Sequence, residues 1–537
     1  MTSAVLLSGI GVLVVGTLLA LWQATVRYAL ATQMFGAAAV AAAGIAVLAG
    51  EKTLGARFTN GVQPSLGLDG LSAFFVVVVC ATAVPALLVA ADALRGRRTA
   101  RPLTALSGAF VLALVGVLAA RDVTMFLGFW ELMTLVPAAA ILVDRREEPV
   151  RRAVFVYLAI THLGGAGVWV AMLILAHEGA LGGSLDAPGL QAVVVIAAII
   201  GFGTKAGLMP LHSWLPRAHP VAPAHISALM SGVMIKVALY GLIRVLFEWA
   251  GTVPLWVGIV VLALGLLSSL GGVLYALVQH ELKQLLAFHS IENVGIIALG
   301  LGAALILETS DEREWASLAF AAALLHTVNH AVFKALLFLG AGAFAQAVGG
   351  LQLDRLGGLL RRMPWTGWTF LVGCAAIAGL PPLNGFASEW LTLQALLHVG
   401  FDSRAGISVA GALATAGLAA TAALAVFCFV KVVGLVLLGA PRTPAAAEAL
   451  ERPALTRAGL AILASACVLL GLFPGLVLPT LAALKPGATD LEAGLRIDLP
   501  GTGGLPPLGL AVVLIAVAAF LLRATSAARR AAVAGGC

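Results

Sequence analysis

Long apolar runs, separated by short polar segments, make up most of this chain. Each run is about 20 residues long, the length that an α-helix needs to cross the hydrocarbon core of a membrane. The runs cover residues 4–22, 29–49, 69–92, 103–120, 122–143, 153–176, 190–211, 222–247, 254–279, 286–307, 316–346, 366–396, 409–439, 456–482 and 505–523. The pattern predicts an all-α polytopic membrane protein with about 14–15 transmembrane helices.

The polar segments between the runs are too short to hold a soluble domain, and the composition agrees. Apolar residues make up 61% of the chain and charged residues 11%, against about 25% charged residues in a typical soluble protein. The first run lacks a charged leading segment and a small-residue cleavage site. We therefore expect it to remain as a helix rather than to be removed as a signal peptide.

The basic residues predict the orientation of the chain in the membrane. The formal net charge is +7, and arginines gather at 95–101 and 145–152. With the N-terminus outside, these clusters and most other basic residues fall in cytoplasmic loops, as the positive-inside rule requires. An odd number of helices then places the C-terminus in the cytoplasm. The excess of basic over acidic residues therefore reflects membrane topology rather than nucleic-acid binding. The excess of arginine over lysine is typical of a GC-rich bacterial genome. We therefore expect the protein to lie in a bacterial cytoplasmic (inner) membrane.

The cysteines give no sign of a redox centre. Four of the five are isolated inside apolar runs and the fifth is the last residue, so none forms a C-x-x-C pair. Neither an iron–sulfur cluster nor a zinc site is predicted. We expect no metal or cofactor in this chain, and any redox chemistry in another subunit.

Two of the predicted helices contain a similar interruption. Residues 207–211 read Gly-Leu-Met-Pro-Leu, and residues 379–383 read Gly-Leu-Pro-Pro-Leu. Proline removes a helical hydrogen bond, so Pro210 and the pair Pro381 and Pro382 should break their helices. Broken backbone at membrane depth is stable only inside the protein or beside a wet cavity. The plainer alternative is that prolines are simply frequent in transmembrane helices.

The two breaks favour a division into repeats. Each unit would hold an acid, then a broken helix with a charge, then a lysine. Two five-helix units fit this order, and an odd number of helices inverts the second unit relative to the first. The predicted divisions are N-terminal helices 1–102, first repeat 103–247, second repeat 254–439 and C-terminal helices 440–537.

Six charged residues lie inside the predicted spans, where each costs roughly 2.5–3.5 kcal/mol near the bilayer centre. They are Glu131, Lys205, Lys236, Lys334, Glu389 and Lys431. Ionisable groups spaced through a helical bundle are typical of a proton path. Glu131 is either a carboxyl that burial neutralises or, as we favour, the ion-pair partner of a buried lysine.

Histidines add groups that titrate near neutral pH. His326 and His330 are four residues apart and share a helix face with Lys334. We favour a hydrated proton relay over a metal site there, because the glutamate of H-E-x-x-H and a third ligand are missing. His289 and Glu292 lie near the start of a predicted helix. They form either a proton entrance or two side chains solvated at the membrane interface.

At these residues the chain resembles the antiporter-like subunits of respiratory complex I and of multisubunit cation/proton antiporters. The resemblance covers about residues 65–450 and rests on segments 129–131, 205–220 and 326–334. Within that superfamily, segments 222–236, 288–295, 380–390 and 428–442 are most similar to the large membrane subunit of energy-converting nickel–iron hydrogenases, the group of formate hydrogenlyase and hydrogenase-4 component B.

The resemblance implies fourteen core helices, inverted repeats and proton translocation driven by a neighbouring redox module. After the core, this chain has one added helix, 505–523, where longer relatives carry more. The identity of the neighbouring subunits is therefore left open.

The leading hypothesis is a proton-translocating membrane subunit of a hydrogenase-like or NADH:quinone oxidoreductase-like complex, with no catalytic site of its own. Its expected partners are other membrane subunits and a peripheral redox arm. The predicted path runs, in order, through Glu131, Lys205, Lys236, His326, His330, Lys334, Glu389 and Lys431. The alternatives are a sodium/proton antiporter or inorganic-carbon uptake subunit, and a structural anchor whose charges are relics.

Overall fold

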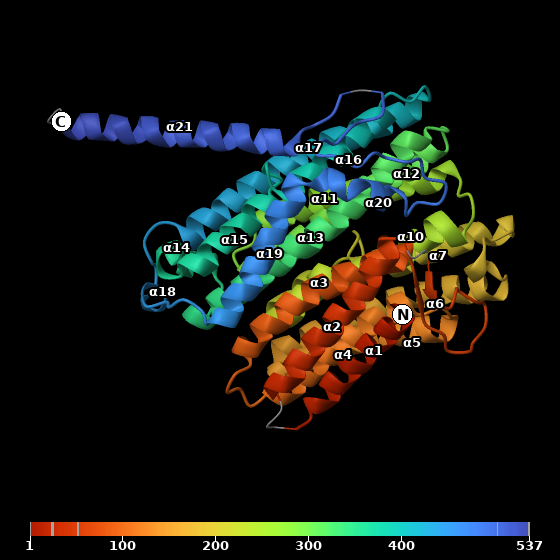
Figure 1. Ribbon diagram of the computed structural model, residues 1–537, viewed down its shortest axis with the longest axis horizontal. Coiled ribbons are helices and arrows are strands. Elements are labelled where there is room, and N and C mark those ends of the chain that lie inside the picture. Colours follow the sequence, from red (N-terminus) through yellow and green to blue (C-terminus); the bar gives the residue numbers. More distant parts are fainter. Residues whose placement is uncertain (1, 23–25, 51–52, 502, 535–537) are drawn as a thin grey trace.

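The computed structural model describes residues 2–22, 26–50, 53–501 and 503–534, and nearly all of its helices pack side by side in one bundle (Figure 1). The all-α prediction is confirmed. The α-helices are α1 Thr2–Leu19, α2 Val26–Leu48, α3 Gly70–Ala93, α4 Ala100–Ala119, α5 Val123–Asp144, α6 Glu148–His177, α7 Pro188–Ala206, α8 Leu215–Val221, α9 Ala224–Leu229, α10 Ile235–Arg244, α11 Leu255–Leu277, α12 Leu282–Glu308, α13 Arg313–Val348, α14 Leu359–Arg362, α15 Pro364–Ile377, α16 Asn384–Val399, α17 Ala405–Val432, α18 Pro444–Ala447, α19 Ala454–Leu472, α20 Leu478–Ala482 and α21 Pro507–Ala534.

The number of spans agrees with the hydrophobic pattern. Within the described residues, 12 helices are long and apolar enough to cross a membrane. Shorter apolar helices within α1 and α21, and the two halves α15 and α16 of an interrupted helix, account for the remaining runs. The chain is therefore a multi-pass membrane protein, as the sequence predicts.

Both predicted breaks are present. Helix α7 ends at Gly207, which adopts the left-handed conformation (φ 89°), and regular helix resumes only at α8. Helix α15 ends shortly before Gly379 (φ 63°), and α16 begins at Asn384. Glycine suits both positions because it alone enters this region without steric cost. At Gly379 a side chain would also displace the Glu389 carboxylate, because a Cβ built there would lie 2.5 Å from its Oε2.

The centre of the bundle is formed by the helices that carry the predicted histidines and lysines. Helix α12 and the segment that runs from α9 through the π-helical turns η3 Met230–Met234 and η4 Val245–Trp249 are buried along their whole apolar windows. Helix α13 packs against α12, α16 and α19, and α19 also packs against α3 (Figure 1). Helices buried on all sides tolerate polar groups only where these find polar partners. Six buried ionisable residues interact electrostatically there and are called the strip below: His219, Lys236, Lys283, Glu292, His330 and Lys334.

Two features were not predicted. A short antiparallel ribbon, β1 Thr53–Gly55 with β2 Gly67–Asp69, precedes α3. The last helix, α21, extends away from the bundle rather than packing into it (Figure 1). The apolar pattern of 505–523 gives the right helix, but the pattern carries no information about where that helix docks.

Candidate functional site: a buried strip of lysines and histidines

Glu131 lies on the outer surface of helix α5, with 27% of its side chain exposed. The indole N–H of Trp169 donates to its carboxylate at 3.0 Å, and Nε2 of His162 lies 3.2 Å from it. The direct ion pair with a lysine that the sequence favoured is therefore not formed. Sequence reasoning missed both partners, although their spacing of seven residues places them on one face of α6.

Lys205 lies at the C-terminal end of α7 and is buried. Its Nζ donates to Oγ1 of Thr134, and lies 5.8 Å and 5.6 Å from the ring centroids of Trp130 and Tyr157. The hydroxyl, the electron-rich ring faces and the negative end of the α7 dipole all favour the ammonium form. Glu131 attracts Lys205 through space. Thr134, one turn beyond Glu131 on α5, is therefore the contact between this lysine and the helix of the acid.

Lys236 is completely buried in α10 and donates to the backbone oxygen of Ser231 at 2.6 Å. The hydroxyl of Ser231 hydrogen-bonds with that of Ser290 on α12 at 2.7 Å. This serine pair ties the helix of Lys236 to the helix at the centre of the bundle.

Tyr157 connects the surroundings of Lys205 with those of Lys236. Its hydroxyl donates to the backbone oxygen of Thr134 at 2.9 Å and lies 3.9 Å from Sδ of Met234. Met234 comes two residues before Lys236 in the chain. Tyr157 is therefore a polar side chain that contacts the surroundings of both lysines.

Two histidines lie among the buried lysines. His330 interacts electrostatically with Lys236 and Lys334, and His219 interacts with these two lysines and with Lys283. Both rings are completely buried, and none of their four nitrogen atoms has a hydrogen-bond partner among the described residues. Buried polar atoms are normally paired with protein groups or water. These nitrogens are therefore the points at which a hydrated relay would contact the protein.

His326, by contrast, is held on both sides. Its Nδ1 hydrogen-bonds with Oγ of Ser388 on α16 at 2.9 Å, and its Nε2 with Oδ1 of Asn293 on α12 at 3.1 Å. Asn329 donates to the backbone oxygen of Asn384 at 2.7 Å. These bonds fix the second broken helix against α12 and α13. Over the described ranges, no group of three His, Cys, Asp or Glu side chains could hold a metal ion.

Glu292 and His289 lie deeper than the sequence suggested. Nδ1 of His289 contacts the Glu292 carboxylate directly, and both side chains are buried. Glu292 is about 15 Å along α12 from its first residue, so the interpretation as two solvated interfacial side chains is wrong. Lys334 attracts Glu292 through space and donates to the backbone oxygen of Leu286 at 2.6 Å.

Lys283 is a member of the strip that sequence reasoning missed. It lies at the start of α12, is 6% exposed, and donates to the backbone oxygen of Ala222 at 2.7 Å. From the sequence it reads as one of the basic residues of a cytoplasmic loop. A loop lysine and a lysine that folds back into the bundle have the same sequence signal.

Glu389 begins the second turn of α16, directly beyond the second break. Its carboxylate packs against Gly379 and interacts unfavourably with Glu292. Among the described residues, it makes no hydrogen bond or ion pair. It therefore sits at the edge of the strip rather than inside it.

Lys431 lies at the end of the bundle and not at its centre. It belongs to the last turn of α17, is partly exposed, and donates to the backbone oxygens of Leu277 and Gln279 at 2.6 Å and 3.2 Å. These carbonyls end α11 and lack partners within that helix. Lys431 lies inside an apolar span, Ala405–Leu437, as the sequence predicts, but it contacts the end of α11 rather than the buried histidines and lysines of the core.

Known proteins are similar to this chain in sequence. The model of the NADH:quinone oxidoreductase/Mrp antiporter transmembrane family matches residues 120–415. Hydrogenase-4 component B of Escherichia coli (strain K12) is 37% identical over 471 residues, which are 84% of this chain and 69% of that protein. Formate hydrogenlyase subunit 3 of the same organism is 39% identical over 297 residues, 55% of this chain and 49% of that protein.

Two solved structures have a similar fold. The membrane-bound sulfane sulfur reductase, an archaeal respiratory membrane complex, matches with a TM-score of 0.76 at 24% identity, over 96% of this chain and 84% of that chain. The Mrp complex from Dietzia sp. DQ12-45-1b matches with a TM-score of 0.73 at 22% identity, over 90% of this chain and 96% of that chain. With the family match over more than half of its length, the chain belongs to the NADH:quinone oxidoreductase/Mrp antiporter transmembrane family.

Proposed function

We propose that this chain moves protons across the membrane as an antiporter-like subunit of a redox-driven complex of the hydrogenase-4, formate hydrogenlyase or NADH:quinone oxidoreductase kind. The observation that carries the proposal is the position of His219 and His330, two completely buried imidazoles with unpartnered nitrogens, among Lys236, Lys283 and Lys334. The similarity to hydrogenase-4 component B and formate hydrogenlyase subunit 3 supports the kind of complex.

The strip suits the transfer of one positive charge at a time. Lys236, Lys334 and the two imidazoles repel one another when protonated. A proton that arrives on one group therefore lowers the proton affinity of its neighbours. Glu292 attracts charge to Lys334 and offsets part of the cost of burying it. A proton entering at Lys283 would therefore be drawn inward and then released by the arrival of the next one.

Glu131 supports the presence of a neighbouring membrane subunit. A carboxylate that is 27% exposed on the membrane-embedded side of α5 would be costly against lipid. Exposed Leu163 and Phe155 lie on the adjacent helix α6, so a protein partner would bury apolar surface there and shield the carboxylate. In our proposal this partner transmits the redox energy of a peripheral arm to Glu131, which attracts Lys205 through space.

We place the complex in the bacterial cytoplasmic membrane, with the N-terminus outside and the C-terminus in the cytoplasm. This orientation puts Lys283 at the cytoplasmic end of the strip. We further propose that metal centres and other cofactors belong to the partner subunits, and that this chain contributes groups that hold and move protons.

Exchange of sodium for protons is the competing function. A hard cation such as Na⁺ prefers several oxygen ligands. The strip presents ammonium and imidazole groups, with Glu292 as the carboxylate that faces Lys334. Its basic character favours protons as the transported ion.

The test uses the intact complex in proteoliposomes with a pH-sensitive dye. His330→Phe keeps the ring size and the apolar packing but cannot carry a proton, so proton uptake driven by the electron donor should fall about a hundredfold. His398→Phe is the matched control, because His398 stacks on Trp315 at 4.2 Å outside the strip. Wild-type uptake in His330→Phe would refute the relay, and uptake that requires a sodium gradient instead of the donor would show an antiporter.

A further inference from the structure

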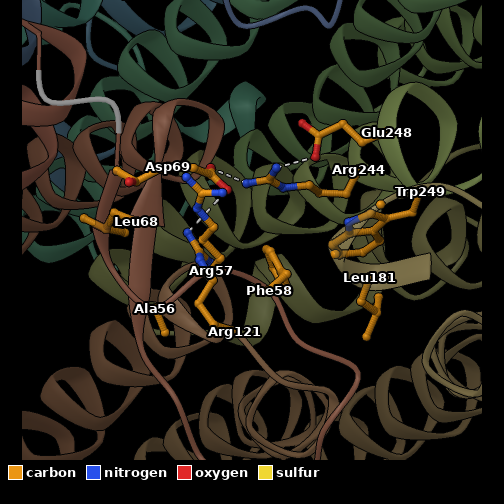
Figure 2. A pocket seen from close by; sticks show the side chains of 13 residues that line it. Ala56, Arg57, Phe58, Leu68, Asp69, Arg121, Leu181, Arg244, Glu248 and Trp249 are labelled. Atoms are coloured by element: carbon orange, nitrogen blue, oxygen red, sulfur yellow. Dashed lines mark hydrogen bonds and ion pairs between the residues drawn. The ribbon is translucent and has the colours of Figure 1, made fainter. Parts of the chain in front are cut away.

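A cavity of about 300 Å³ opens at the end of the bundle where the β1–β2 ribbon, the α4–α5 turn and the end of η4 meet (Figure 2). Charged side chains and the rings of Phe58 and Trp249 line it. In the proposed orientation this end faces the outside. Such a cavity admits water from that side to the charged groups in its wall.

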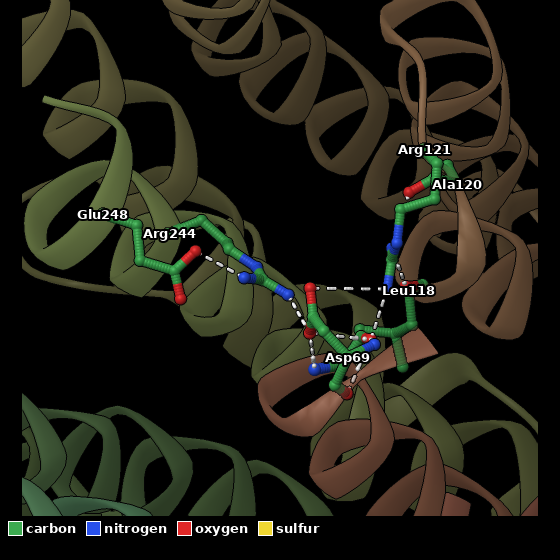
Figure 3. A network of polar contacts seen from close by, with 7 residues as sticks. Asp69, Leu118, Ala120, Arg121, Arg244 and Glu248 are labelled. Carbon is green, nitrogen blue, oxygen red and sulfur yellow. Dashed lines mark hydrogen bonds and ion pairs between the residues drawn. The ribbon is translucent and has the colours of Figure 1, made fainter. Parts of the chain in front are cut away.

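These groups form one network (Figure 3). Arg244 contacts Asp69 and Glu248 through its two terminal nitrogens. Arg121 lies 3.6 Å from Asp69 and donates to Oγ of Ser72 at 2.6 Å and to the backbone oxygens of Leu118 and Ala120 at 3.0 Å and 2.8 Å.

The arginines lie beneath the acids. The side chains of Arg121 and Arg244 are 1% and 4% exposed, whereas those of Asp69 and Glu248 are 25% and 23% exposed. The ring of Phe58 lies 4.6 Å and 5.4 Å from the two guanidinium carbons. Water in the cavity therefore meets the carboxylates first, and two fixed positive charges lie behind them.

The network ends close to a lysine of the proton path. Lys236, Tyr240 and Arg244 are spaced four apart on α10 and share one face. The guanidinium of Arg244 lies 5.1 Å from the ring of Tyr240, whose buried hydroxyl interacts electrostatically with Arg244 and Arg121. Eight residues of helix span about 12 Å. The outer cavity thus approaches the buried lysine to within about two helical turns.

We propose that Arg121 and Arg244 form an electrostatic barrier that keeps protons and other cations in the outer cavity from reaching Lys236. Fixed positive charges at a narrow point exclude protons from other membrane pores in the same way. The proposal rests on the proposed function, because a barrier is needed only where a proton path would otherwise be short-circuited from outside. On this proposal, protons cannot enter the first half of the chain from the outside.

Asp69 fits this role as a fixed counter-charge. Burial by itself raises the pKa of this carboxyl, but the adjacent guanidinium groups of Arg244 and Arg121 hold its pKa below the usual range. The carboxylate therefore stays ionised near neutral pH and holds both arginines in place instead of carrying protons.

The experiment measures passive proton leak through the reconstituted complex, without an electron donor, after a pH gradient is imposed. Arg244→Gln and Arg121→Gln should each raise the leak about tenfold, since a unit charge about 10 Å away contributes at least that much at an effective dielectric constant near 20. Arg244→Lys keeps the charge, so its proton leak should stay at the wild-type level. Glu248→Gln removes the other carboxylate that contacts Arg244 but leaves the arginine charge, so its proton leak should also stay at the wild-type level. Arg313→Gln, at an exposed arginine, is the background control.

Each outcome decides the proposal. A leak at the wild-type level in an assembled Arg244→Gln complex would overturn it, and so would loss of donor-driven uptake without a leak, which would make the network part of the path. If Arg244→Gln does not assemble, the double variant Arg244→Gln/Glu248→Gln removes the charge without stranding a carboxylate, and the same criteria apply. Donor-driven uptake by the wild type in the same vesicles tests the proposed function separately.

Discussion

The hydroxyl of Thr134 gives the sharpest test of how Lys205 holds a proton. Lys205 is 1% exposed, and its Nζ donates to this hydroxyl, which in turn donates to the backbone oxygen of Trp130 at 3.2 Å. Thr134→Val preserves the shape of the side chain and removes the acceptor. Among the described residues, no other side-chain oxygen hydrogen-bonds Lys205, so the buried ammonium would lose its partner.

The size of the effect follows from the energy of that bond. A hydrogen bond to a charged group contributes about 1.5–3 kcal/mol, and each 1.36 kcal/mol changes an equilibrium tenfold. The ratio of protonated to neutral Lys205 should therefore fall about ten- to a hundredfold in Thr134→Val. If Lys205 is loaded once in each cycle, donor-driven proton uptake in proteoliposomes should fall by a similar factor, while the complex remains assembled.

Two further variants separate the hydroxyl from packing. Thr134→Ser keeps the acceptor and should transport at a rate close to wild type. Thr421→Val removes a buried hydroxyl that donates only to Gly417 within its own helix, at 2.8 Å, and should have little effect on transport. Wild-type uptake in Thr134→Val, or an equal loss in Thr134→Ser, would refute the reasoning.

The other predictions concern stability and topology. Gly379→Ala should lower the free energy of unfolding by about 1–2 kcal/mol, because alanine is strained at positive φ and the Glu389 carboxylate must move aside for its Cβ; a thermal-shift assay in detergent would show this, and an unchanged midpoint would contradict it. Asp69→Asn should destabilise the protein by about 3 kcal/mol near neutral pH, because buried Arg121 loses its carboxylate partner and Arg244 keeps only Glu248. The pKa of Asp69 is lowered in the folded state, so this stabilisation is present above about pH 4 and is lost as the pH falls through the folded pKa. The difference in stability between Asp69→Asn and the wild type should therefore shrink only in acid. A difference that already disappears near neutral pH would be evidence against the pairing. In intact cells, an impermeant thiol reagent should label Gly183→Cys but not Arg146→Cys, and the reverse result would invert the proposed topology.

The sequence by itself determined the class of the protein, the number of spans and the two breaks. Apolar runs of membrane-crossing length leave few alternatives, because backbone groups in a bilayer must be paired within each helix. Pro210 and Pro382 fix the breaks through local chemistry that does not depend on what packs around them. For the same reason, the charges inside the runs could be recognised as candidate functional residues before their neighbours were known.

Only the tertiary structure decided which charges meet. Helical periodicity states which residues share a face, but it does not state which other helix lies opposite. The sequence therefore paired Glu131 with a lysine, whereas the fold pairs it with His162 and Trp169 of α6. The fold buries Lys283, which the sequence placed in a loop, and leaves Lys431 partly exposed at the end of α11, because packing sets the direction of a flexible side chain near a helix end.

The outer charge network depends on contacts between residues that are far apart in the sequence. Asp69, Arg121 and Arg244 come from three different segments, and each reads in the sequence as an ordinary residue at the end of a helix. They become one buried group only because the ribbon before α3 brings Asp69 between the two arginines. Burial then strengthens their attraction, by excluding the water that would weaken it in an exposed loop.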